Sequence, residues 1–419
     1  MRYKIQPEDF VVEEQMRLPL APQGPFAVYR VRKRGTTTLR VRAQMARALG
    51  VPESAVVAPA LKDKDAVTVQ HVAVRGSGPA RLAGPGFEAE FQGRISRPLT
   101  PGDIVANCFT VVLRDLSDEE SSRIQERLAQ VARCGLPNYF DQQRFGSLVP
   151  GEDHIGKRIL QRDAEGALRA YLTQPFAGDP APVRKFKPFA AAHWGDWDAV
   201  FQAAPRPSNF RSVLTYLRDH PTADPEQLVL HYRKALNLIT RRLLSLYLAA
   251  YQSLLWNRIA GRYLAAQLGD ADAHVEIAGE RLLLYHELPP RFDRDTTIPL
   301  PNHRAVYSAS PPHTPSPPRS GGFRDSFARS ESTANSPNLS PIVTQVLTEE
   351  GLALNDLKAR ILKKAYLSKG KRVLLLFPQD STASPPEPDD RFPDRHKVTL
   401  TFTLPRGSYA TLAIKALSL

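Results

Sequence analysis

The chain has 419 residues, 42% of them hydrophobic and 24% charged, so it is long enough for two or three domains, each with its own core. Its 56 Lys and Arg residues outnumber 43 Asp and Glu residues, and the resulting net charge of +13 favours a polyanionic partner such as a nucleic acid. Two cysteines exclude a disulfide framework and a four-thiolate zinc site. The sequence has no membrane-spanning apolar stretch and no apolar signal segment, so we expect a cytoplasmic protein.

The first 150 residues mix short strands with helices. A helix is predicted from Ser117, where Ser-Asp-Glu-Glu is a capping box, to Gly135, a natural helix end. Another helix is predicted over 39–49. Alternating or β-branched runs predict strands at 10–14, 27–32, 67–74 and 108–114. This part of the chain is therefore predicted to be α+β.

The middle of the chain, from about 151 to 360, is predicted to be mainly helical. Asp224 and Pro225 provide an N-cap and a first-turn proline, and apolar residues then recur with helical spacing as far as Gly269. Because more than forty residues are long for one globular helix, we expect a break or two packed helices.

A segment rich in Pro and Ser, 308–341, nearly lacks aliphatic side chains, which predicts a flexible insertion without a catalytic role. Beyond it the run 372–377 predicts a buried strand. In 396–404 apolar residues alternate with threonines, which predicts a strand with one buried face. Strands at both ends of a helical middle indicate one domain interrupted by another.

The charged segment Lys62-Asp63-Lys64-Asp65 lies between two apolar runs, a typical place for a functional turn. We expect one of its two carboxylates to be the working group. Lys62 and Lys64 would help to keep that carboxylate ionised, which suits a nucleophile better than a general acid. The alternative is an ordinary charged hairpin turn.

A second segment, 137–146, interleaves Tyr and Phe with Asn, Gln and Arg. This mixture of residues can stack on bases and form hydrogen bonds with their edges. The aromatic side chains could equally fill the core of their domain, and the sequence leaves both interpretations open.

Four motifs in order, KIQPEDFVVEE, KDKDAVTVQ, NYFDQQRFG and FTLPRGSYAT, resemble the TruD family of tRNA pseudouridine synthases, from Lys4 to about Lys415. The resemblance implies an α+β pseudouridine synthase catalytic domain with a mixed, largely antiparallel sheet. This domain would comprise residues 1–150 and 370–419. An inserted α/β TRUD domain, 151–369, would interrupt it and form a cleft with it for RNA.

The resemblance also implies which residues form the site. Asp63 matches the family's catalytic aspartate, and Asp65 falls at a variable position. The helix 251–257 resembles a family helix too, but we expect most of its residues to pack in the core between the domains. Four further residues match positions that bind the substrate: Lys4, Phe10, Asn138 and Phe140.

The activity implied is that of an isomerase, a tRNA pseudouridine synthase that converts uridine to pseudouridine, at position 13 in the D-arm of certain tRNAs. Asp63 would be the nucleophile, and whether it attacks C1′ or removes the C2′ proton stays open. We expect no metal or cofactor, no membrane, no obligate protein partner and a monomer with tRNA as its partner. The alternatives are a non-catalytic RNA-binding protein or RNA chaperone that uses the same basic cleft, and a hydrolytic nucleosidase or glycosidase.

Overall fold

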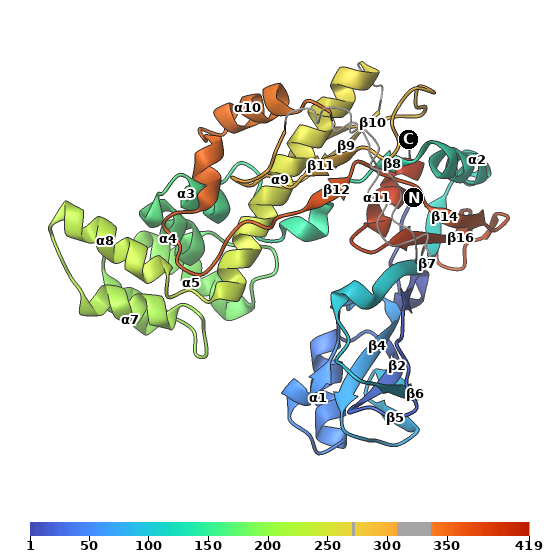
Figure 1. The fold of residues 1–419 in the computed structure, drawn as a ribbon, viewed down its shortest axis with the longest axis horizontal. Coiled ribbons are helices and arrows are strands. Elements are labelled where there is room, and N and C mark those ends of the chain that lie inside the picture. The colour runs from blue at the N-terminus through green and yellow to red at the C-terminus, as the bar shows by residue number, and fades with distance from the viewer. Residues whose placement is uncertain (270–272, 308–336, 419) are drawn as a thin grey trace, which may run out of the picture. The chain divides into compact units, whose positions relative to one another are not determined.

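The computed structural model describes residues 1–269, 273–307 and 337–418, which form two compact units (Figure 1). The first unit combines Met1–Leu136 with Leu376–Leu419, and the second is Pro137–Leu375. The first unit is thus built from both ends of the chain. The second unit consists of the continuous segment between these two ends.

A ten-stranded sheet forms the first unit, in the order β14-β16-β7-β1-β4-β2-β6-β5, with β15 beside β16 and β3 beside β4. Strands β1 and β4 run parallel, and every other neighbouring pair in this sheet is antiparallel. The predicted α+β class with a mixed, largely antiparallel sheet is confirmed. The strands are β1 (Phe10–Met16), β2 (Phe26–Arg34), β3 (Val56–Val57), β4 (Val67–Arg75), β5 (Arg81–Gly84), β6 (Phe87–Ile95), β7 (Ile104–Leu116), β14 (Gln379–Ala383), β15 (Glu387–Pro388) and β16 (His396–Pro405).

The C-terminal strand β16 joins the end of the chain to the N-terminal strands by pairing with β7. Its alternation was predicted from the sequence, and Val398, Leu400, Phe402 and Leu404 are all buried. The four strands predicted in the first 150 residues are also confirmed, as β1, β2, β4 and β7. Local hydrophobic pattern therefore determines the main strands of this unit.

Helices cover the sheet as the local signals predict. The helix α2 (Asp118–Cys134) begins with a complete capping box, in which the Ser117 hydroxyl accepts a hydrogen bond from the Glu120 N–H at 3.1 Å. It ends at Gly135, which has a φ of 72°. The C-terminal helix α11 (Ala410–Leu417) contacts α2, which itself contacts β7, β14 and β16.

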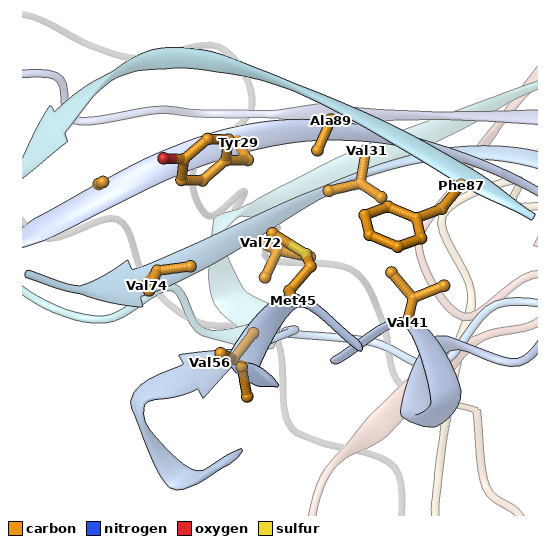
Figure 2. Close-up of a cluster of buried hydrophobic side chains, with 11 residues drawn as sticks. Tyr29, Val31, Val41, Met45, Val56, Val72, Val74, Phe87 and Ala89 are labelled. Atoms are coloured by element: carbon orange, nitrogen blue, oxygen red, sulfur yellow. The ribbon is translucent and has the colours of Figure 1, made fainter. Parts of the chain in front are cut away.

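The helix α1 (Thr38–Ala48) packs on strands β2, β4 and β6 through a buried cluster (Figure 2). Met45 is fully buried and lies among Tyr29, Val72 and Phe87. This cluster holds α1 against the sheet, and Thr38 at the start of α1 accepts the Lys62 N–H from the loop that carries Asp63.

The second unit is mainly helical, and its 28-residue helix α9 is prominent in Figure 1. The expected break in the long apolar run lies between α8 and α9, where the Asn237 side chain donates to the backbone oxygens of Arg233 and Ile361. Thr240 then caps α9. The helices are α3 (Ile155–Leu160), α4 (Ala164–Thr173), α5 (Ala181–Ala192), α6 (Trp197–Ala203), α7 (Arg211–Asp219), α8 (Pro225–Leu236), α9 (Arg241–Leu268) and α10 (Ser340–Glu349).

Two antiparallel pairs complete the second unit: β9 (Ala273–Ile277) with β10 (Glu280–Leu284), and β11 (Thr297–Pro299) with β12 (Lys371–Val373). The short strands β8 (Leu136–Pro137) and β13 (Leu375–Leu376) lie where the chain passes from one unit to the other. Residues 308–336 of the Pro/Ser segment lie outside the described residues. Its described end leads into α10, which begins at Ser340.

The prediction of one buried strand over 372–377 is wrong. The Val373 residue is 42% exposed, and the run divides into β12 and β13. The reason is a change of partners along the chain, because β12 pairs with β11 whereas the Leu374 carbonyl accepts the Asn138 N–H at 2.8 Å.

Met45→Ala tests the packing of α1 on the sheet. We expect it to lower the free energy of unfolding of the first unit by about 2–5 kcal/mol, because it leaves a cavity in a filled core. Leu39→Ala, on the same helix but 45% exposed, should change this free energy by less than about 0.5 kcal/mol. Hydrogen exchange of the slowest amides in β2 and β4 measures both effects, and equal effects would contradict this packing.

Candidate active site

Sheet topology brings two distant motifs together. Strands β1 and β4 are parallel neighbours with Val11 opposite Val67. The segments that precede them therefore meet at the N-terminal ends of these two strands. Lys4 lies in the segment before β1, and Asp63 lies in the loop that joins β3 to β4. This parallel pair places a cation and a carboxylate side by side.

The loop that carries Asp63 is anchored at its base by a chain of buried polar groups. The Lys62 N–H donates to the Thr38 hydroxyl at 3.0 Å, and this hydroxyl donates to the Gln70 side chain at 3.1 Å. Thr38 begins α1 and Gln70 lies in β4, so the loop is held by a helix and a strand. These contacts explain why the KDKDAVTVQ motif ends on a glutamine that is 1% exposed.

Lys62 does not pair with Asp63. Its ammonium contacts the buried Glu14 carboxylate at 2.8 Å and donates to the Asn107 side chain at 2.6 Å. Lys64 is exposed. We expected Lys62 and Lys64 to keep the Asp63 carboxylate ionised. In the structure two other lysines, Lys4 and Lys33, have this effect.

The Asp63 carboxylate is held by the Lys4 ammonium, which lies 2.5 Å from its Oδ2 atom. Its Oδ1 atom accepts the backbone N–H of Asp65 at 3.1 Å. The Lys33 ammonium, on β2, donates to the backbone carbonyl of Asp63 and to that of Thr36. The Asp63 side chain is still 25% exposed, so its carboxylate is both oriented and open to a ligand.

Lys4 itself is positioned by the PEDF part of its motif. Its φ of 59° lies in the left-handed region, which is uncommon for a residue other than glycine. The buried Asp9 carboxylate accepts the N–H groups of Ile5 and Gln6, and Arg114 binds the same carboxylate at 3.0 Å. The Lys4 ammonium lies 4.2 Å from the centre of the Phe10 ring, a cation–π contact.

Electrostatics favour an ionised Asp63. Burial is the largest single influence on this carboxyl group and would by itself raise its pKa, but the Lys4 ammonium and the groups near it together hold the pKa below its ordinary value of 3.8. The Asp65 N–H and the charge of Lys33 lower the pKa further. Burial lowers the pKa of Lys33 to about 8, so Lys33 is charged at neutral pH. At pH 7 the site therefore presents a carboxylate and two ammonium groups.

The NYF segment lies in the second unit and is buried there. The Asn257 side chain on α9 accepts the Phe140 N–H and donates to the Phe140 carbonyl, both at 2.8 Å. Arg372 donates to the backbone and side-chain oxygens of Asn138, both at 2.7 Å, and its guanidinium lies 4.2 Å from the Phe140 ring centre. The Trp256 ring meets Phe140 edge to face.

The described residues contain no cluster of three His, Cys, Asp or Glu side chains that could hold a metal ion. They also contain no helix long and apolar enough to cross a membrane. The chemistry available at Asp63 is that of an oriented, ionised carboxylate, which can act as a nucleophile or as a base.

A family model described as tRNA pseudouridine synthase D (TruD) matches residues 1–299, well over half of the chain. The chain belongs to the TruD family. This is a family of isomerases, and its match includes both units of the structure in part.

Relatives of this TruD chain match it from end to end. "Probable tRNA pseudouridine synthase D 1" of Methanococcus maripaludis is 25% identical over 425 residues, which cover 99% of this chain and 98% of the relative. The "tRNA pseudouridine synthase D" of Aquifex aeolicus is 25% identical over 428 residues, with 100% and 98% covered. A crystal structure of a TruD protein from Methanosarcina mazei superposes with a TM-score of 0.69 at 21% identity and shares the fold, covering 100% of this chain and 93% of the other.

The five site residues that the sequence predicts fall into two groups in the TruD chain. Lys4, Phe10 and Asp63 lie together in the first unit, whereas Asn138 and Phe140 lie in the second. Sequence reasoning missed three residues that position them: Lys33, Asn257 and Arg372. Lys33 gave no signal beyond the basic run on β2, and Arg372 was assigned to a buried strand.

Lys4→Gln tests the electrostatic control of Asp63. We expect the pKa of the Asp63 carboxyl to rise, because burial would act against fewer opposing charges. Carbon-13 NMR titration of labelled aspartates, assigned with Asp63→Asn, measures this shift. Lys64→Gln removes an exposed lysine of the same loop and should leave the titration of Asp63 unchanged. If Asp63 titrates alike in the wild type, Lys4→Gln and Lys64→Gln, Lys4 does not control its pKa.

The lowered pKa of Asp63 also makes the stability of the fold depend on pH. Folding lowers the pKa of Asp63. The ion pair therefore stabilises the fold at pH values above 3.8, the ordinary pKa of this carboxyl group. This contribution is lost as the pH falls through the lower pKa of the folded state.

Asn257→Ala tests the support of Phe140. We expect the free energy of unfolding of the second unit to fall by about 2–4 kcal/mol, because the Phe140 N–H and carbonyl lose their partner in a buried site. Asn355→Ala, at an exposed position of the same unit, should change it by less than about 0.5 kcal/mol. Hydrogen exchange of the α9 amides reports both values, and a neutral Asn257→Ala would refute the role.

Proposed function

We propose that this chain isomerises uridine to pseudouridine in tRNA, with Asp63 as the nucleophile. The observation that carries the proposal is the ionised, partly exposed Asp63 carboxylate, which is held by the Lys4 ammonium that also lies over the Phe10 ring, in a chain of the TruD family. The relatives from Methanococcus maripaludis and Aquifex aeolicus are named for this activity.

The chemistry requires that the N-glycosidic bond break, that uracil turn within the site and that its C5 bond to C1′ of the ribose. An ionised carboxylate beside the sugar can attack C1′ or remove the C2′ proton, and both steps need an unprotonated oxygen. The lowered pKa of Asp63 ensures that form at neutral pH. The Lys4 ammonium then balances the charge of the carboxylate whenever no substrate does.

We propose that Lys4 and Phe10 of the first unit and Asn138 and Phe140 of the second unit bind the RNA substrate. Removing a base from its stack costs a few kcal/mol, and stacking on an aromatic ring returns about 1–3 kcal/mol. The Arg372 guanidinium already lies over the Phe140 ring, so a stacked uracil must share this ring with Arg372 or displace it.

We propose that the first unit belongs to the catalytic domain and that residues 151–369, which lie in the second unit, form the inserted TRUD domain. Following the family resemblance, the target is uridine 13 in the D-arm of certain tRNAs, and the enzyme acts as a monomer in the cytoplasm without an obligate protein partner. The net charge of +13 supports a polyanionic substrate.

Release of tritium from C5-labelled uridine in a tRNA transcript tests the activity. We expect Asp63→Ala to lower the rate by about 10³-fold or more, since a nucleophile has no substitute. Asp65→Ala should stay within about twofold of wild type, because the Asp65 side chain is exposed and its backbone N–H is retained. A transcript with cytidine at position 13 should release little tritium.

Three outcomes would contradict the proposal. If Asp65→Ala loses the rate while Asp63→Ala keeps it, the nucleophile is wrongly assigned. Binding of tRNA without any tritium release by the wild-type chain would favour a non-catalytic RNA-binding protein. Free uracil among the products would show a hydrolase.

A further inference from the structure

A basic pocket of about 460 Å³ lies in the second unit between residues 302–304 and 357–369. Its two walls are tied together by Gln252, a buried residue of α9, whose side-chain amide donates to the Pro301 and Ser368 carbonyls, both at 2.8 Å. The pocket is therefore preformed, and its volume is within the range typical of ligand sites.

The charge of this pocket is uniformly positive. Arg304, Lys358 and Lys369 line it, and none of the lining residues is acidic. Within the residues that the structure describes, no carboxylate forms an ion pair with any of these three cations. The pKa of His303 is lowered by burial and then by the same three cations, as expected where their fields converge. Mutual repulsion of such cations is relieved by a bound phosphate.

An exposed aromatic ring stands at the same pocket. Tyr366 is 63% exposed, and its hydroxyl donates to the Lys363 carbonyl at 3.0 Å, which fixes the direction of the ring. Leu357 and Leu367 are buried and form the apolar part of the lining. A ring that is held in place but left open, beside a cluster of cations, is the arrangement on which single-stranded bases stack.

We propose that this pocket of the second unit is a subsite that binds one unpaired nucleotide of the RNA substrate. Arg304, Lys358 and Lys369 hold its phosphates, and Tyr366 stacks on its base. The choice of RNA as the ligand rests on the proposed function. The subsite contributes to binding and takes no part in the chemical step.

Salt dependence of tRNA binding tests the phosphate contacts. For Arg304→Ala/Lys358→Ala/Lys369→Ala in the whole chain, we expect the Kd for an unmodified tRNA transcript to rise about 10- to 100-fold. The slope of log Kd against log salt should fall by about 2, since each phosphate contact contributes about 0.7. Filter binding between 50 and 300 mM salt, about the range over which such contacts are screened, measures both quantities.

A charge-matched control separates this pocket from general attraction. Lys185→Ala/Arg241→Ala/Arg242→Ala removes three exposed cations of the same unit that do not line the pocket. It should change the Kd less than about threefold, as expected for screened surface charges. Equal losses for the two triple variants would overturn the proposal.

The base contact is tested at Tyr366. Tyr366→Ala should weaken tRNA binding by about 5- to 100-fold, whereas Tyr366→Phe should weaken it less than about threefold, because it keeps the stacking ring and loses only the hydroxyl that orients it. In both cases kcat at saturating tRNA should stay within about twofold while KM follows the Kd. A Tyr366→Ala variant that binds tRNA as wild type does would refute the subsite.

These experiments distinguish failure of the subsite from failure of the proposed activity. If wild type releases no tritium but the pocket variants lose tRNA binding, the subsite stands and the activity fails. If wild type is active and these variants bind tRNA normally, the subsite fails and the activity stands. Uridine monophosphate that binds as tightly as tRNA, and loses binding in the same variants, would make this a site for free nucleotides and contradict the proposal.

Discussion

The candidate active site depends on one ion pair, between the Lys4 ammonium and the Asp63 carboxylate. Burial alone would push the pKa of this carboxyl upward, and the ion pair, together with the Asp65 N–H and the charge of Lys33, reverses that direction. The ring of Phe10 lies against the same ammonium, so the cation is shared by a carboxylate and an aromatic face. Most of the polar contacts around the site serve to hold these groups where they are.

The parallel pairing of β1 with β4 explains why the motifs KIQPEDFVVEE and KDKDAVTVQ lie close together. In the first motif Lys4 contributes the ammonium of the ion pair, and Asp9, bound by Arg114, fixes the backbone on which Lys4 adopts its left-handed conformation. In the second motif Asp63 contributes the carboxylate, and Gln70 fastens the loop through Thr38. Each motif thus combines one charged group of the ion pair with a polar group that fixes the backbone.

Much of the fold could be predicted because its signals are local: the capping box at Ser117 and the alternation of β16 each need only a few adjacent residues. The site was harder. Lys33 reaches the Asp63 backbone only because β2 pairs with β4, and a sequence shows the basic run without showing that pairing. Arg372 lies in an apolar run and was taken for part of a buried strand, whereas its side chain binds Asn138 and covers Phe140. Long-range pairings of this kind have no local signature.

The central claim is that an ionised Asp63 makes this chain a tRNA-modifying enzyme. The most direct measurement maps pseudouridine across total tRNA from cells that lack the protein and carry either the wild-type chain, the Asp63→Ala chain or none. We predict a uridine in the D-arm that is pseudouridine only with the wild-type chain. The same modification in cells with Asp63→Ala, or an unchanged map in cells without the protein, would contradict the account.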